Sequence, residues 1–168
     1  RAAADFSNGL DDWSTFGTRG VSVASPPTPP PQSALRLQRI DPDFPAAAVW
    51  NFPMGASGEL TTDLLLEPGC RGVRIGLADH FSVPYDLEDL FHNIVNLTLA
   101  PDPTASSLGP LPAGRWIRLA LRWNGGSRQC TVVLDSRRVL RIPFQHSTPG
   151  LGYLRLRSLS AESEPGAA

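Results

Sequence analysis

The sequence predicts an all-β protein, and three observations support this. Turn-forming residues recur at short intervals between short apolar runs, which is typical of antiparallel strands joined by hairpins. The 168 residues include 17 prolines, about twice the average share, and proline interrupts long helices. Several apolar runs alternate with a period of two, as strands with one buried face do. We therefore expect one domain, residues 1–168, that is long enough to bury a core.

Ten segments are expected to form strands. They are residues 20–24, 33–40, 46–52, 58–66, 71–78, 91–99, 115–123, 128–134, 137–142 and 151–159. The turn Asn124-Gly125-Gly126-Ser127 predicts a hairpin, because Asn and Gly readily adopt the positive φ that a tight hairpin turn needs. Asp135-Ser136-Arg137 predicts a second tight turn. Residues 115–142 should therefore form a three-strand meander.

Two segments depart from this pattern. Residues 85–93 are the only stretch with a helical spacing of apolar residues, which predicts a single helical turn. The segment "SPPTPPPQS", residues 25–33, holds five prolines and is interpreted as a surface loop, with a polyproline recognition motif as the alternative. Too few residues precede it to form a domain of their own. The chain need not be divided.

Charge and hydropathy exclude several classes of partner. The net charge is −1 and the pI is near 6.3, so there is no electrostatic basis for binding nucleic acid or an anionic membrane. No run approaches the roughly 20 apolar residues of a membrane-spanning helix. The chain opens on Arg1-Ala2-Ala3-Ala4, without an initiator Met or a signal peptide, and is interpreted as a mature protein or as part of a longer one.

The two cysteines, Cys70 and Cys130, leave two readings open. They could close one disulfide in an oxidising compartment, which would stabilise the fold by roughly 4 kcal/mol in the chain-entropy model. The alternative is two reduced cysteines, each packed on a strand.

One strand raises the question of a binding surface. In "GRWIRLALRW", residues 114–123, one face carries apolar side chains and the other carries arginines and an aromatic ring. The segment at 151–159 repeats this mixture. Aromatic rings stack on sugar faces, and arginine binds carboxylates or sulfates with two hydrogen bonds. The candidate carbohydrate-binding residues are therefore Trp116, Arg118, Arg122, Tyr153, Arg155 and Arg157. The alternative is that these arginines form cross-strand ion pairs, with their stems covering the sheet.

Residues 78–92 gather acidic side chains in one expected loop. Oxygen ligands clustered in a loop suit Ca²⁺, which accepts six to eight oxygens in a loose geometry. The candidate ligands are Asp79, Asp86, Glu88 and Asp89. Zinc would need more nitrogen or sulfur ligands than His80 and His92 supply. The alternative is a loop whose acids are solvated.

No catalytic signature is present in the sequence. Glycosidases need two carboxylates that face each other across a cleft. The best candidates are Glu59, Asp63 and Glu67, but they lie along one expected strand at a spacing that suits no single sugar site. We interpret Glu59 and Asp63 as a solvated strand face that pairs with arginines of a neighbouring strand.

Three stretches resemble the concanavalin A-like, LamG-like jelly rolls of secreted bacterial proteins. They are the opening "DFSNGLDDWSTFGTRGVSV", the meander "LPAGRWIRLALRWN" with "CTVVLDSRRV", and "GLGYLRLRSL". The resemblance implies two antiparallel sheets packed face to face, one of them concave. It also implies a secreted or extracytoplasmic module that binds sugar or acts as a spacer beside a carbohydrate-active enzyme.

The expected function is a non-catalytic accessory module that binds or positions a polysaccharide, with an anionic one favoured by the arginines. Two alternatives stay open: a subunit or fragment of a glycoside hydrolase or polysaccharide lyase, and a purely structural docking module. Domains of this resemblance commonly close with one more strand, whereas the residues after Leu159 are polar and turn-like. We expect either a truncated domain or a partner chain that supplies the strand by edge addition.

Overall fold

The computed structural model describes residues 2–16, 19–27, 32–86 and 88–160. Within them the chain is almost entirely β. The elements are β1 (Trp13–Thr15), β2 (Val21–Ala24), β3 (Ala34–Leu37), β4 (Ala47–Gly55), β5 (Ser57–Leu65), β6 (Val73–Ala78), α1 (Asp89–His92), β7 (Val95–Leu99), β8 (Trp116–Asn124), β9 (Gln129–Leu134), β10 (Arg138–Pro143) and β11 (Leu151–Ser158). The all-β prediction is confirmed.

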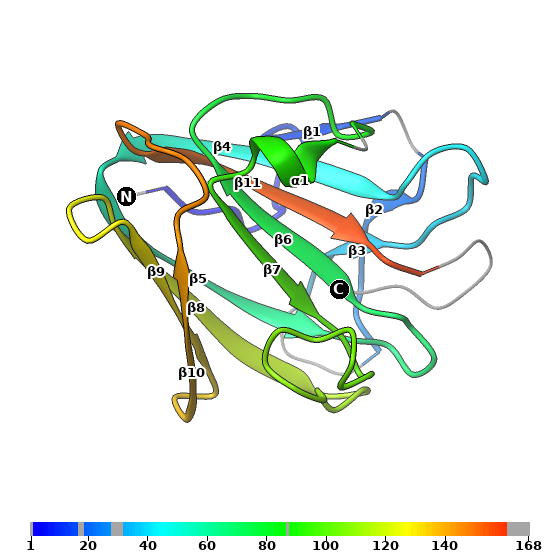
Figure 1. Ribbon diagram of the computed structural model, residues 1–168. Coiled ribbons are helices and arrows are strands. Elements are labelled where there is room, and N and C mark those ends of the chain that lie inside the picture. Colours follow the sequence, from blue (N-terminus) through cyan, green and yellow to red (C-terminus); the bar gives the residue numbers. More distant parts are fainter. Residues whose placement is uncertain (1, 17–18, 28–31, 87, 161–168) are drawn as a thin grey trace.

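Two antiparallel sheets lie face to face as the layers of a sandwich (Figure 1). The five-strand sheet has the order β1-β4-β11-β6-β7, and the four-strand sheet has the order β10-β9-β8-β5. A separate hairpin joins β2 to β3. Apolar side chains from the facing sides of both sheets, such as Ile75, Leu97, Leu119 and Val132, fill the space between them and form the core. The predicted two-sheet jelly-roll architecture is confirmed.

The period-two reading of β8 is also confirmed. Ile117, Leu119, Leu121 and Trp123 are buried, with exposed fractions of 6% or less. Arg118 and Arg122 on the alternate positions are exposed. Burying such apolar side chains stabilises the fold by roughly 1.5–3 kcal/mol each, which fixes the face that the strand turns inward.

The predicted meander forms from β8, β9 and β10, although its two turns differ from each other. Asp135 and Ser136 have φ values of 47° and 57°, as the central residues of a type I′ hairpin do. In the first turn the positive φ falls on Arg128, at 51°, and not on the Asn-Gly pair. The Asn124 side chain instead accepts a hydrogen bond from the Ser127 backbone N–H at 3.0 Å.

Three further sequence expectations need comment. The strand expected at 91–99 is shorter, because Phe91 and His92 close the helical turn α1 and β7 begins at Val95. Strand β1 was not expected. The proline-rich segment lies between β2 and β3, with residues 28–31 outside the described residues, as are residues 161–168, where a closing strand would follow.

Cys70 and Cys130 form no disulfide, and both thiols are buried. Burial raises the pKa of the Cys130 thiol to about 11, so this thiol stays protonated at neutral pH. Among the described residues no helix is long and apolar enough to cross a membrane.

Candidate functional site

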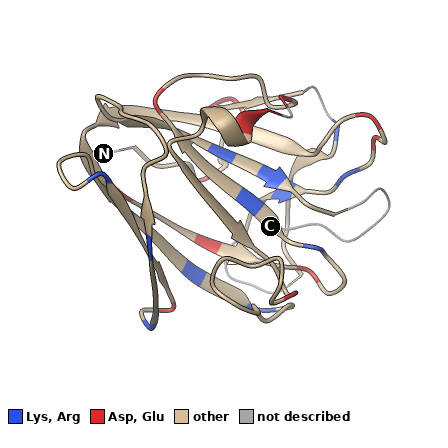
Figure 2. Cartoon of the chain, viewed as in Figure 1, with Lys and Arg blue, Asp and Glu red and all other residues tan. Residues whose placement is uncertain are grey.

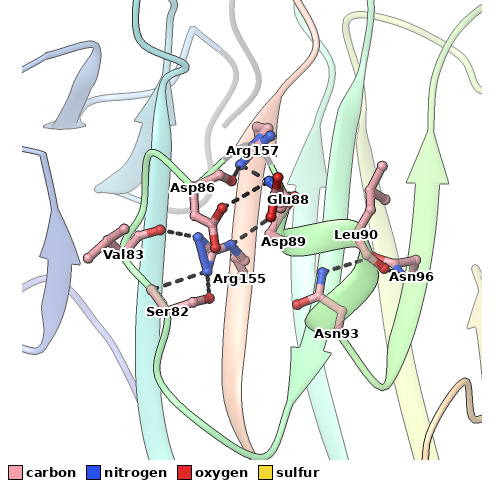
Figure 3. Close-up of polar contacts among 10 residues, drawn as sticks. All are labelled: Ser82, Val83, Asp86, Glu88, Asp89, Leu90, Asn93, Asn96, Arg155 and Arg157. Atoms are coloured by element: carbon pink, nitrogen blue, oxygen red, sulfur yellow. Dashed lines mark hydrogen bonds and ion pairs between the residues drawn. The ribbon is translucent and has the colours of Figure 1, made fainter.

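A buried ion-pair network lies on the outer side of the five-strand sheet, over strand β11 (Figure 3). Arg155 and Arg157 alternate along β11 and point away from the core, and Asp89 at the start of α1 lies against both of them. Arg155 Nε donates to Asp89 Oδ2 at 3.0 Å, and Arg157 Nη2 lies 3.3 Å from Asp89 Oδ1. All three side chains are at most 7% exposed. They are therefore part of the packed structure and are not available to a ligand.

The same two arginines hold the backbone of the loop that precedes α1. Arg155 Nη1 donates to the Ser82 carbonyl at 3.1 Å, and Arg155 Nη2 donates to the Val83 carbonyl. Arg157 donates to the Asp86 carbonyl. Burial lowers the pKa of both guanidiniums, an effect that the charge of Asp89 opposes. The network therefore ties Ser82, Val83, Asp86 and Asp89 to the sheet.

A second set of contacts fixes the end of this loop. Asn93 Nδ2 donates to Asn96 Oδ1 at 2.8 Å, and Asn96 Nδ2 donates to the Leu90 carbonyl at 2.9 Å. Asn93 lies directly over Gly76 of β6, where an added Cβ would come within 2.3 Å of the Asn93 amide. Gly76 is therefore required for the close approach of the loop to the sheet. We call residues 79–86 and 88–93 the pinned loop.

The pinned loop exposes several large apolar side chains. Seven large hydrophobic side chains are exposed among the described residues, and four of them belong to this loop. They are Phe81, Val83, Tyr85 and Phe91, with exposed fractions of 47%, 39%, 38% and 72%. Exposed apolar side chains that are concentrated in this way mark interaction sites more often than scattered ones do.

Two pairs of rings involve adjacent residues of this loop, His80 and Phe81. The Phe81 ring lies edge-on to Tyr153 of β11, with centroids 6.3 Å apart, and the His80 and His92 rings are 6.1 Å apart. His80 Nδ1 is 2.6 Å from Asp79 Oδ1. Partial burial raises the pKa of Asp79, but hydrogen bonds from His80 and Thr148 outweigh this and lower it below its ordinary value. We call Asp79, His80, Phe81, His92 and Tyr153 the aromatic surface.

The aromatic surface has the chemistry of a sugar site. The Phe81 and Tyr153 rings offer apolar faces, and the ionised Asp79 carboxylate offers hydrogen-bond acceptors for hydroxyl groups. The pinned loop supplies four of the five residues, and the buried network beneath it holds the backbone in place. Such preorganisation lowers the cost of ordering the site when a ligand binds.

No protein-family model and no curated protein matches the chain. Solved structures do. A chain described as a sialidase matches with a TM-score of 0.71 at 18% identity, over 96% of this chain and 15% of that one. The carbohydrate-binding module CBM66 from Bacillus subtilis matches with a TM-score of 0.58 at 12% identity, over 95% of this chain and 92% of that one.

The exoplasmic/lumenal domain of VIP36, in a form bound to Ca²⁺ and Man3GlcNAc, matches with a TM-score of 0.52 at 12% identity, over 93% of this chain and 80% of that one. The chain has a concanavalin A-like jelly-roll fold. Identities this low show the fold alone, and this concanavalin A-like domain spans only a small part of the sialidase chain.

The concanavalin A-like fold divides the six candidate carbohydrate-binding residues into two groups of three, one on each sheet. Trp116, Arg118 and Arg122 lie on the outer side of the four-strand sheet, whereas Tyr153, Arg155 and Arg157 lie on the outer side of the five-strand sheet. Figure 2 shows the corresponding basic positions on β8 and on β11, in different layers of the sandwich. They do not form one surface, because the outer sides of two stacked sheets face opposite ways.

Cross-strand ion pairs, the alternative reading of the arginines, are present. Arg118 Nη1 lies 2.7 Å from Asp63 Oδ2, and Arg122 Nε pairs with Glu59 Oε2. Glu67 pairs with Arg36 of β3 at 3.0 Å. The interpretation of Glu59 and Asp63 as a strand face paired with arginines is confirmed. Of the six candidate residues, Tyr153 belongs to the aromatic surface.

The four acidic candidates do not gather around a common point. Asp89 is held by two arginines, Asp79 by His80, and the Asp86 carboxylate accepts a hydrogen bond from the Glu88 backbone N–H at 2.9 Å. Within the described residues no group of three or more His, Cys, Asp or Glu side chains has the arrangement of a metal site. Calcium binding stays a prediction, for which a change of melting temperature on chelation is the measurement.

Most of the aromatic surface lies in the same segment as the predicted calcium ligands, but it rests on different side chains. The acids of residues 78–92 predict a metal-binding loop, whereas the structure exposes aromatic rings of the same segment. The signal was present in "HFSVPYDLEDLFH", where four aromatic or apolar residues that the structure exposes occur in a loop with few strand features.

Proposed function

We propose that this domain is a non-catalytic carbohydrate-binding module that takes its glycan on the aromatic surface. One observation carries the proposal: the exposed Phe81 ring lies against Tyr153, on a loop that a buried Arg–Asp network fixes to the sheet. The fold is consistent with it, since the matched structures include a carbohydrate-binding module and a protein bound to an oligosaccharide.

A role beside a larger enzyme fits the same observations. The match to the sialidase covers 15% of that chain, so domains of this shape occur within longer enzymes. The acids that resemble glycosidase carboxylates, Glu59, Asp63 and Glu67, each engage an arginine. We therefore place the chemistry in a neighbouring domain and assign to this one the positioning of polysaccharide outside the cytoplasm.

The test is a binding titration with neutral and anionic oligosaccharides, read by calorimetry. Phe81→Ala and Tyr153→Ala should each weaken binding by about two- to tenfold, the range expected for a lost aromatic contact. Val139→Ala is the matched control, because Val139 is an exposed apolar side chain on the other sheet. It should bind as well as the parent.

A second control addresses the arginines of β8. Arg118→Ala combined with Arg122→Ala should leave the affinity unchanged, because both guanidiniums are paired with carboxylates and lie on the other sheet. A loss of binding in this double variant, together with weaker binding at high salt, would move the site to β8 and favour an anionic glycan. Parent-like binding by both Phe81→Ala and Tyr153→Ala would exclude the aromatic surface.

A further inference from the structure

Strand β5 forms one edge of the four-strand sheet, and within the described residues it pairs with β8 alone. The Gly125 N–H donates to the Ala56 carbonyl at 2.7 Å, so Gly125 and Ala56 form a hydrogen-bonded pair. Hydrogen-bonded and non-hydrogen-bonded pairs alternate along two antiparallel strands, so every second residue of β5 from Ala56 onward is bonded to β8. Backbone groups of the even-numbered residues of β5 therefore point toward β8. Those of Ser57, Glu59, Thr61 and Asp63 point to the open edge.

An apolar cavity lies beneath this edge. It has a volume of about 690 Å³ and runs between the two sheets along nearly the whole length of β5. Trp50 and Phe52 of β4 line it on one side, and Leu60 of β5 and Trp123 of β8 line it on the other. Residues 2–6 and strand β3 also contribute to its lining. An edge strand that borders an apolar crevice can accept both the backbone and the alternate side chains of an added strand.

The outer side of β5 is acidic. Glu59 and Asp63 have side chains that are 45% and 46% exposed, and each pairs with its arginine through a single carboxylate oxygen. A strand added at the open edge would place its own outward side chains directly beside these two residues. Residues Arg118-Leu119-Ala120-Leu121-Arg122 of β8 show which pattern fits β5, since Arg118 lies opposite Asp63 and Arg122 opposite Glu59.

We propose that the open edge of β5 is a docking site for an extended peptide with the pattern basic–apolar–any–apolar–basic. Its two basic side chains would lie beside Asp63 and Glu59, and its two apolar side chains would enter the cavity. The peptide would add a fifth strand to the four-strand sheet. This site is separate from the aromatic surface, which lies on the other sheet, and the proposal does not depend on glycan binding.

Charge favours such a peptide over a second copy of this chain. The pattern exists on β8, but β8 is enclosed by β5 and β9 and cannot be offered to another molecule. Antiparallel pairing of two β5 strands centred on Thr61 would place Glu59 opposite Asp63 of the other copy, and like charges directly opposite each other are destabilising.

The probe is a labelled synthetic peptide, Thr-Arg-Leu-Ala-Leu-Arg-Thr with blocked ends, titrated against the domain and read by fluorescence anisotropy. Two isomers of this peptide, methylated at the backbone nitrogens of either the arginines or the leucines, distinguish strand addition from nonspecific charge attraction. In an antiparallel complex the arginine N–H groups face β5 and the leucine N–H groups face away. Methylation of the arginine backbone nitrogens should weaken binding by roughly tenfold or more, whereas methylation of the leucine nitrogens should change it little.

A protein variant tests the same geometry from the other side. Thr61→Pro removes an edge N–H that β8 does not use and should abolish binding, whereas Thr61→Ala should retain it. Equal binding of the two methylated isomers would overturn the proposal, as would no saturable binding of the unmodified peptide. Concentration-dependent self-association that Thr61→Pro abolishes would also overturn it, because the edge would then belong to a second copy.

Discussion

Asp89 shows how a single carboxylate organises this molecule at the scale of a residue. It is 1% exposed and lies against two arginines that are 3% and 6% exposed. Burying charges is unfavourable unless each is paired and hydrogen-bonded. Here the second positive charge is accommodated by carbonyls of the pinned loop, so the loop conformation and the charge balance depend on each other.

Asp89→Asn should therefore destabilise the domain strongly. Removing one partner of a buried ion pair leaves the other charge uncompensated, and the expected loss is about 3–5 kcal/mol of unfolding free energy. Urea denaturation followed by circular dichroism measures it. Glu88→Gln is the control, since Glu88 is exposed and adjacent in sequence. Equal midpoints for the two variants would mean that the network does not stabilise the fold.

At the scale of elements, the position of the pinned loop depends on a contact between strand β6 and the end of helix α1. Strand β6 contributes Gly76, and the end of α1 contributes Asn93, which packs on it. The absence of a side chain at 76 is what lets the loop lie flat on the outer side of the sheet. A sheet face that would otherwise be solvated thus becomes the base of the aromatic surface.

Gly76→Ala should push the loop away from the sheet. The added methyl would lie 2.3 Å from the Asn93 side chain, and overpacking of this kind costs roughly 1–3 kcal/mol. Chymotrypsin should then cleave the loop faster, at Phe81, Tyr85 or Phe91. Gly152→Ala in β11 is the matched control, because its nearest contacts are at an ordinary 3.4 Å. Similar cleavage rates in both variants would contradict the packing role of Gly76.

At the scale of the whole molecule, the sandwich has two outer sides with different characters. The pinned loop lies on the outer side of the five-strand sheet, and that side carries the proposed glycan surface. The outer side of the four-strand sheet carries exposed ion pairs between β5 and β8. Such pairs contribute about 1 kcal/mol or less each, so this side is free to serve as an interface without cost to the fold.

The single-domain prediction has a direct measurement. One core shared by both sheets should unfold in one cooperative transition, with far-ultraviolet circular dichroism and tryptophan fluorescence giving the same midpoint. Leu119→Ala, at a fully buried position of β8, should lower both midpoints together by an amount that corresponds to about 2–5 kcal/mol. Two separate transitions in either protein would show that the sheets are independent units.

The sequence by itself determined the strands. Alternating apolar residues give a strand one apolar face, and turn residues limit its length. Strand β8 and the meander that it begins could therefore be predicted from local pattern alone. Strand β1 escaped prediction because its three residues are too few to show a period. The shared spacing of acids and arginines on β5 and β8 was also readable, since both signals lie within single strands.

Only the tertiary structure decided where the arginines go. Arg118 and Arg155 have the same local pattern, a basic residue on the outward face of a strand, yet one is solvated and the other is 3% exposed. The difference arises because the pinned loop folds over one sheet and not the other. That choice rests on contacts between residues far apart in the sequence, such as Asp89 and Arg155, which are 66 positions apart and which no local period records.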